Sequence, residues 1–146
     1  MKLHPLHPVS VHAPIACIVF APLADLGATL THLPFMWAVG ALMTAGAAMF
    51  SLIAASFGAM DFERAYAKAP KTVSWHAIFM GCAVTLDGIS AFGRLAKGHE
   101  ITAPPAAWAI ALSALALAIA AVGGFLGGDL VYRHGVNVEN RPPQRR

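Results

Sequence analysis

The chain has 146 residues, of which 58% are hydrophobic and only 12% are charged. Soluble domains carry about 25% charged residues, so this composition argues against a water-soluble fold and predicts a membrane protein. The net charge of +3 comes from basic residues scattered over several loops without interleaved aromatic residues. That distribution excludes a nucleic-acid-binding surface.

Four apolar segments are each long enough to cross a bilayer, because a membrane-spanning helix needs about 20 mostly apolar residues. They lie at about residues 11–30, 35–60, 75–95 and 106–131. We therefore expect an all-α integral membrane four-helix bundle that forms a single domain over residues 1–134. The remaining residues, 135–146, are polar, basic and proline-containing, which predicts a flexible tail.

The first segment has a second interpretation as a secretory signal, because Lys2 precedes its apolar part. His12, Pro14, Pro22 and Asp25 all lie in or beside that apolar part, and no small-x-small cleavage motif is followed by soluble sequence. We therefore expect the first helix to be retained.

Basic residues are divided unevenly between the two sides of the expected bundle. Eight lie in the two termini and in the expected middle loop, residues 61–74, whereas only Arg94 and Lys97 lie on the other side. Cytoplasmic loops carry an excess of Lys and Arg. Both termini are therefore predicted to be cytoplasmic.

The third segment carries a polar stripe. At about 100° per residue, His76, Asp87 and Arg94 share one face, which we expect to point into the bundle. Asp25 of the first segment comes at the depth of Asp87. A buried carboxylate needs a partner or a proton, so we expect a buried ion cluster of Asp25, Asp87 and Arg94. A proton or cation pathway is the alternative.

Four histidines are expected at one depth near the cytoplasmic side: His7, His12, His76 and His134. Neutral imidazole is a common ligand for transition metals and for haem iron. The leading hypothesis is a small b-type haem protein that carries electrons. In it His12 and His76 form one axial pair, and His7 and His134 form a second pair or support the first. No C-x-x-C-H motif is present, so the haem would not be attached covalently.

Two glycines and two aspartates fit supporting roles around these histidines. Gly123 and Gly127 share a helix face with His134 and would clear space for a flat cofactor, although small residues in membrane helices commonly serve helix contacts. Asp61 and Asp129 reach the same depth. Each would accept the second ring N–H of a ligating histidine and so fix its tautomer.

Two further functions remain open. The same histidines with Asp61 or Asp129 would suit a non-haem zinc or iron site, in a hydrolase or a metal-handling protein. The histidines would also suit interhelical hydrogen bonds in a structural subunit without a cofactor. Because no H-E-x-x-H, G-x-S-x-G or phosphate-loop motif occurs, we favour cofactor binding over hydrolysis. Apart from the lipid bilayer, the candidate partners are a redox protein, a quinone and a second copy of the chain.

The motifs HPVSVHAPI, GAMDF and GGFLGGDLVYRHGVNV, together with Asp25 and His76, resemble the bacterial membrane family catalogued as domain of unknown function 2231. The resemblance covers nearly the whole chain, and the closing motif is its most specific part. It implies a four-helix inner-membrane domain whose repeated histidine motifs correspond to His7, His12, His76 and His134. Similar domains occur joined to Rieske-type or cytochrome-type redox modules, which implies electron transfer with a separate partner here.

Overall fold

The computed structural model describes residues 6–96, 98 and 100–138, and these residues are almost entirely helical. A short helix, α1 (Leu6–Ser10), precedes four long helices. These are α2 (His12–Thr31), α3 (Pro34–Lys68), α4 (Pro70–Leu95) and α5 (Ala107–Tyr132). No strand occurs within the described ranges. The prediction of an all-α fold is therefore confirmed.

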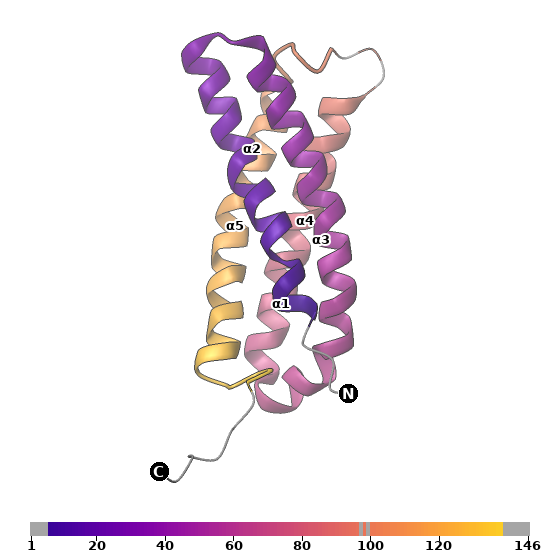
Figure 1. Cartoon of the computed structure of the whole chain (residues 1–146), viewed down its shortest axis with the longest axis vertical. Coiled ribbons are helices and arrows are strands. Elements are labelled where there is room, and N and C mark those ends of the chain that lie inside the picture. Colours follow the sequence, from indigo (N-terminus) through magenta and orange to yellow (C-terminus); the bar gives the residue numbers. More distant parts are fainter. Residues whose placement is uncertain (1–5, 97, 99, 139–146) are drawn as a thin grey trace, which may run out of the picture.

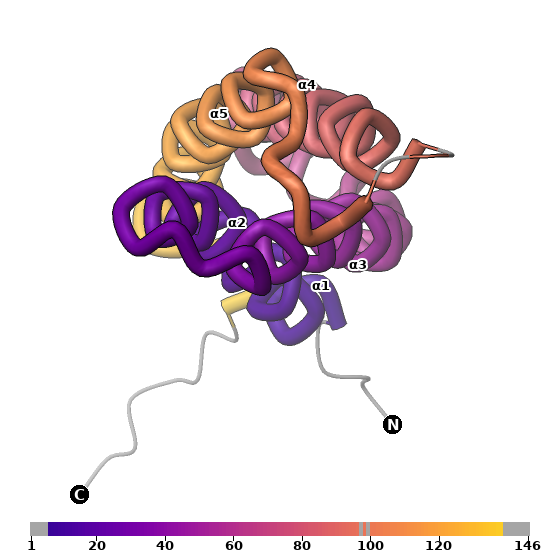
Figure 2. The backbone as a smooth tube through the Cα atoms, turned by 90° about the horizontal axis from the view of Figure 1, so that it is seen from above, coloured from indigo at the N-terminus to yellow at the C-terminus, as the bar shows by residue number. Residues whose placement is uncertain are grey.

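The four long helices run side by side along the long axis of the molecule (Figure 1). Seen along that axis, they form a ring in which α2 lies opposite α4 and α3 lies opposite α5 (Figure 2). The closest packing joins α2 to α3, α3 to α4 and α4 to α5, while α1 packs on α3 from outside the ring. The bundle is thus built from two helical hairpins, α2–α3 and α4–α5.

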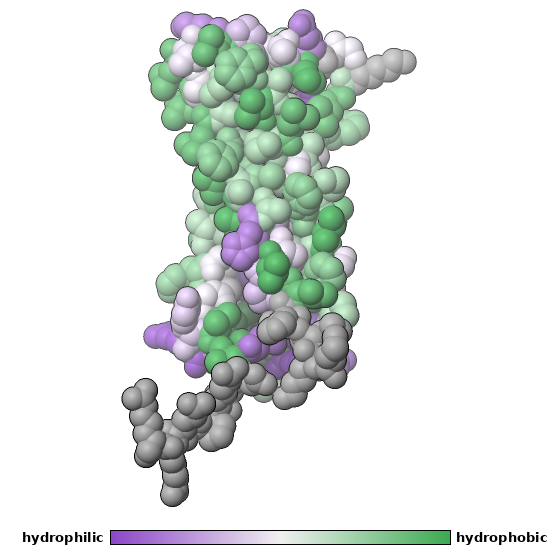
Figure 3. Space-filling model, viewed as in Figure 1, coloured by the Kyte–Doolittle hydropathy of each residue, from purple (hydrophilic) through white to green (hydrophobic). Residues whose placement is uncertain are grey.

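Large apolar side chains lie on the outside of this bundle and small ones lie inside. Phe92 and Phe125 are 76% and 77% exposed, and hydrophobic surface covers most of the length of the face seen in Figure 3. The most deeply buried apolar residues are all alanines, namely Ala21, Ala47, Ala83, Ala109 and Ala116. Lipid solvates large apolar side chains well, whereas small residues let membrane helices approach closely.

All four long helices are long and apolar enough to cross a membrane. Together with the outward-facing apolar side chains, this identifies the chain as a multi-pass membrane protein. α1 begins and α5 ends toward the same end of the bundle, where α3 also turns into α4 (Figure 1). The assignment of that end to the cytoplasm stays a prediction.

The prediction of a loop at residues 61–74 is wrong. α3 continues to Lys68 and α4 begins at Pro70, so Ala69 alone separates the two helices. The sequence DFERAYAK contains no helix-breaking residue, and proline is well tolerated at the first position of a helix. The charged residues of this stretch mark the end of the apolar span but not the end of the helix.

The start of the predicted flexible tail is also corrected. Val136 is buried in a small cluster with Ala65, Ala69, Val73 and Leu130. In addition, the Lys68 ammonium group donates a hydrogen bond to the carbonyl of Gly135 at 2.5 Å. Residues 135–138 therefore fold back over the turn between α3 and α4. The rest of the predicted tail, residues 139–146, lies outside the described residues.

The two hairpins correspond to each other at a constant offset of 69 residues. Arg94 follows Asp25 by that number, and both are buried. The same offset relates the following buried pairs: Ile18 and Asp87, Ala21 and Ser90, Gly40 and Ala109, Thr44 and Ser113, Ala47 and Ala116, and Ala54 and Gly123. Parallel repeats related by an axis along the membrane normal are known in membrane proteins. The bundle is therefore an internal repeat of one hairpin.

Packing between α4 and α5 depends on Gly123. A Cβ atom at this position would lie 2.6 Å from Sδ of Met80, whereas a Cβ atom at Gly124 would meet nothing within 4 Å. We expect Gly123→Leu to lower the stability of the detergent-solubilised protein by about 1–3 kcal/mol through overpacking. The matched variant Gly124→Leu should change it by about 0.5 kcal/mol or less.

Thermal unfolding of both variants, followed by circular dichroism, tests this packing. Both substitutions replace glycine by leucine in the same helix and so bring the same helix propensity. Equal unfolding temperatures for the two variants would contradict the close approach of α4 and α5 at Gly123.

Candidate functional site

The most completely buried large side chain is that of Arg94 in α4. Its Nη1 and Nη2 atoms donate hydrogen bonds to Oδ1 and Oδ2 of Asp25 in α2, at 2.9 and 2.5 Å. Ser90 and Ser113 each accept a further hydrogen bond from the guanidinium at 3.2 Å. This bidentate ion pair joins the two hairpins in the bundle interior, and each charge is balanced by the opposite charge of its partner.

Glycine at position 40 lets α3 approach this ion pair. A Cβ atom there would overlap Oδ1 of Asp25 and would lie 3.3 Å from Nη1 of Arg94. Ser113 brings α5 to the same place. All four long helices therefore meet at the Asp25–Arg94 pair.

Asp87 does not belong to this pair, which corrects the expected cluster of three charges. Its side chain is buried, and neither carboxylate oxygen has a hydrogen-bond partner in the described part of the chain. The helical wheel places Asp87 and Arg94 on one face, but their spacing of seven positions separates their Cα atoms by about 10 Å along the helix. The guanidinium is moreover already engaged by Asp25 and two serines.

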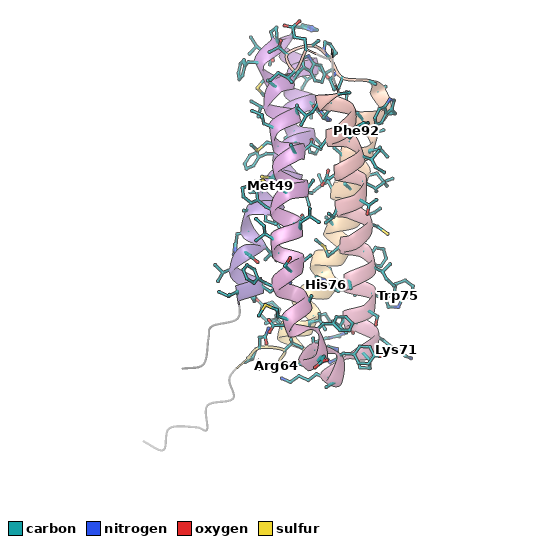
Figure 4. The ribbon with its side chains drawn as sticks, turned by 90° about the vertical axis from the view of Figure 1, so that its right-hand side faces the viewer. Met49, Arg64, Lys71, Trp75, His76 and Phe92 are labelled. Carbon is teal, nitrogen blue, oxygen red and sulfur yellow. The ribbon has the colours of Figure 1, made fainter. Side chains whose placement is uncertain are left out.

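Two of the four candidate histidines, His7 and His76, come together. Their ring centroids lie 6.4 Å apart and their planes are nearly perpendicular, at 81°. His76 points from α4 toward the bundle interior, whereas the neighbouring Trp75 lies on the outer side of the helix (Figure 4). His7 and His76 are also 69 residues apart, so they occupy corresponding positions in the internal repeat, with α1 preceding the first hairpin and His76 lying near the start of the second.

Each ring of this histidine pair is held by the same local arrangement. Nδ1 of His7 lies 2.8 Å from the carbonyl oxygen of Ala54, and Nδ1 of His76 lies 2.8 Å from that of Gly123. A carbonyl only accepts hydrogen bonds, so Nδ1 carries the proton in both rings. In the neutral form, Nε2 therefore keeps its lone pair, which is the state in which imidazole binds a metal ion.

A glycine lies against each ring, one helical turn after the carbonyl that the ring binds. A Cβ atom at Gly58 would lie 3.1 Å from Cε1 of His7, and one at Gly127 would lie 3.1 Å from Cε1 of His76. Larger residues would push both rings away. The space that Gly127 was expected to clear is therefore taken by the His76 ring, and Gly123 contributes its carbonyl oxygen.

His12 and His134 lie elsewhere. The His12 side chain is exposed, and its Nδ1 is 3.1 Å from the carbonyl oxygen of Val9 in the preceding turn. His7 and His12 are five residues apart and so point about 140° apart on a helix. That angle explains why the ring that contacts His76 is His7 and not His12. His134 lies beside Asp129, with Nε2 and Oδ2 3.6 Å apart.

Neither of the aspartates expected to support the ligands contacts His7 or His76, although Asp129 does lie beside His134. Asp61 accepts a hydrogen bond from the side-chain amide of Asn137 at 3.0 Å. Asp129 lies 3.3 Å from Nε of Arg133 in the next helical turn. Backbone carbonyls of α3 and α5 take the supporting role at His7 and His76, because the two imidazoles reach across to neighbouring helices rather than to the ends of their own.

Three or more ligating side chains do not gather at one point in the described ranges. No group of at least three His, Cys, Asp or Glu residues is placed to hold a metal ion there. His4 and His99 lie outside these ranges. The expected non-haem site formed by four histidines and an aspartate is therefore not assembled from its described members.

Comparison with known proteins gives one result. A family model described as "Predicted membrane protein (DUF2231)" matches residues 3–140 of the chain. No curated protein and no solved structure matches the chain. The matched range includes all five helices, the histidine pair and the ion pair.

The Asp25–Arg94 pair allows a double-substitution test. Removing one partner of a buried ion pair leaves an uncompensated charge and costs about 3–5 kcal/mol, whereas replacing both by apolar residues costs much less. We therefore expect Arg94→Met or Asp25→Leu alone to lower the unfolding free energy strongly, and the double variant to recover much of the loss. Chemical unfolding in detergent provides the measurement.

Arg133→Met supplies the control for this cycle, since its side chain is 79% exposed beside Asp129. An exposed ion pair contributes about 0–1 kcal/mol. If the losses in the two single variants simply added in the double variant, the two residues would not act as a pair.

Proposed function

The chain belongs to the family of predicted membrane proteins catalogued as domain of unknown function 2231, and from this premise we propose that it is a small b-type haem protein that carries electrons in the bacterial inner membrane. The single observation that supports this proposal is the pair formed by His7 and His76. These two imidazoles would be the axial ligands, in place of the pair His12 and His76 that depth alone favours.

The spacing of the two rings suits a metal ion between them. With metal–nitrogen bonds of about 2 Å, the ring centroids of two imidazoles on opposite sides of one metal ion are about 6 Å apart. The separation of 6.4 Å between His7 and His76 is close to that value. Both rings also donate Nδ1–H to a backbone carbonyl, which is one of the common outer partners of a ligating histidine.

The number of converging ligands favours haem over a non-haem metal. A structural or catalytic zinc site uses three or four protein ligands, and the described residues bring only two imidazoles together. A porphyrin supplies four equatorial nitrogens of its own, so two axial histidines complete the coordination of its iron. When bound, such a haem accepts and donates one electron at a time.

The residues of the chain would then set the properties of this cofactor. The apolar interior of the bundle would lower the local dielectric and exclude water, and the carbonyls of Ala54 and Gly123 would fix the orientation and the tautomer of the two imidazoles. A redox protein, a quinone or a second copy of the chain would be the electron partner. The cytoplasmic location of both termini belongs to the same proposal.

A structural role is the second candidate, because both hydrogen bonds of the histidine pair cross between helices. His7 connects α1 to α3, and His76 connects α4 to α5. Such bonds hold membrane helices together without any cofactor. A substitution that keeps the hydrogen bond but removes the metal ligand separates the two functions.

Glutamine is that substitution, since its amide donates a hydrogen bond but is a poor ligand for haem iron. The full chain purified in detergent from haem-replete cells should show a Soret band and, after reduction with dithionite, sharp visible bands. We expect His7→Gln and His76→Gln to lose at least one axial ligand, with loss or a marked shift of these bands. The matched variants His12→Gln and His134→Gln should keep the wild-type spectrum.

Each alternative gives a different result in this experiment. A colourless wild-type protein would rule out the haem proposal, and stoichiometric zinc or iron in elemental analysis would then favour a non-haem site. Loss of the spectrum in His12→Gln but not in His7→Gln would restore His12 as the ligand. A structural role alone would change only the unfolding temperature of His7→Gln and His76→Gln.

A further inference from the structure

Asp87 carries a carboxyl group in the bundle interior that belongs neither to the Asp25–Arg94 ion pair nor to the histidine pair. Its side chain is 1% exposed. Both of its oxygens lack a hydrogen-bond partner among the residues that the structure describes. An ionised carboxylate in such a place would lose its hydration without compensation, which is among the most expensive arrangements in a protein.

The charges of the interior do not balance if Asp87 is ionised. The positive charge of Arg94 is matched by Asp25 through two direct hydrogen bonds. The corresponding stretches of the other hairpin helices, residues 35–60 of α3 and 107–128 of α5, contain no titratable side chain. One unit of positive charge is therefore missing around Asp87.

The titratable side chains of the two remaining helices do not supply that charge. On α2 they are His12, Cys17 and Asp25, and on α4, besides Asp87 itself, they are Lys71, His76, Cys82 and Arg94. Lys71 lies sixteen residues before Asp87 and its side chain is exposed. Cysteine and aspartate carry no positive charge in either protonation state. His76 lies eleven residues from Asp87, or about 16 Å along α4, and His12 and Cys82 have exposed side chains.

The repeat explains why Asp87 has no partner across the bundle. The position 69 residues earlier, which corresponds to Asp87, holds Ile18, and this residue is also buried. Ile18 packs with Cys17 and Ala47 in an apolar cluster that includes Leu117 of α5. One hairpin thus supplies a carboxyl group at a position where the other hairpin supplies a hydrocarbon side chain.

The buried hydroxyl group one helical turn from Asp87 does not donate a hydrogen bond to it. Ser90 donates to the carbonyl of Ala109 at 2.6 Å and accepts from Nε of Arg94. Its single hydrogen is therefore not available to an ionised Asp87 carboxylate.

We propose that Asp87 is a proton-binding site inside the membrane-spanning bundle, where it holds one proton per chain as a neutral carboxylic acid. The proton comes from water, and its binding forms an O–H bond on one carboxylate oxygen and removes the unmatched negative charge. This proposal does not depend on haem binding. It assigns to α4 a second site, separate from the histidine pair.

Infrared spectroscopy of the full chain in phosphatidylcholine vesicles tests the proposal, because the C=O stretch of a protonated carboxyl group is distinct from the bands of a carboxylate. At neutral pH we expect a protonated-acid band that shifts when the aspartates are labelled with ¹³C at the carboxyl carbon. Asp87→Asn should remove this band. The control Asp61→Asn, which changes a carboxylate that pairs with Asn137, should leave it in place.

A second variant covers the case in which Asp87→Asn does not fold. Asp87→Glu keeps an acid at this position, and in protein labelled only at aspartate its protonated-acid band should lose the isotope shift. A folded wild-type protein without the band at neutral pH would overturn the proposal. So would a band that disappears when sodium is added at constant pH, because Asp87 would then be a cation site rather than a proton site.

Discussion

The ion pair between Asp25 and Arg94 is the interaction on which the arrangement of the bundle depends. A guanidinium inside a bilayer is tolerated only if its donors are satisfied by the protein, and here the partners come from α2, α4 and α5. Because both side chains must reach the centre, the helices around them carry alanine, serine or glycine at the facing positions. The small side chains of the interior are therefore needed to make room for the charged pair.

The internal repeat gives this constraint its form. Along the bundle, corresponding positions hold like residues at His7 and His76, opposite charges at Asp25 and Arg94, and unlike residues at Ile18 and Asp87. Two hairpins with the same backbone arrangement thus place a histidine pair, an unpaired carboxyl group and an ion pair at successive depths. The difference between the hairpins, rather than their similarity, creates the isolated carboxyl group.

Much of the fold follows from the sequence because hydropathy and helix length are one-dimensional properties. Four spans can be counted directly, and the wheel correctly turns Asp87 and Arg94 inward. The sequence does not predict the continuation of α3 to Lys68, because polar residues end the apolar span without ending the helix. Depth alone also favoured His12, since it ignores the rotation between His7 and His12. The offset of 69 residues is visible in the sequence, but alanine-rich helices obscure it, and only burial makes the pairs stand out.

The length of α3 has a mechanical consequence for the way the protein sits in its membrane. Its 35 residues extend over about 52 Å, whereas the hydrocarbon layer is about 30 Å thick. At least part of this helix must therefore lie in the headgroup region and in water. This part is at the end of the bundle that carries Arg64 of α3 and Lys71 of α4 (Figure 4). Because this extension is charged, it holds the turn between α3 and α4, and the cluster around Val136 that packs on it, outside the hydrocarbon layer.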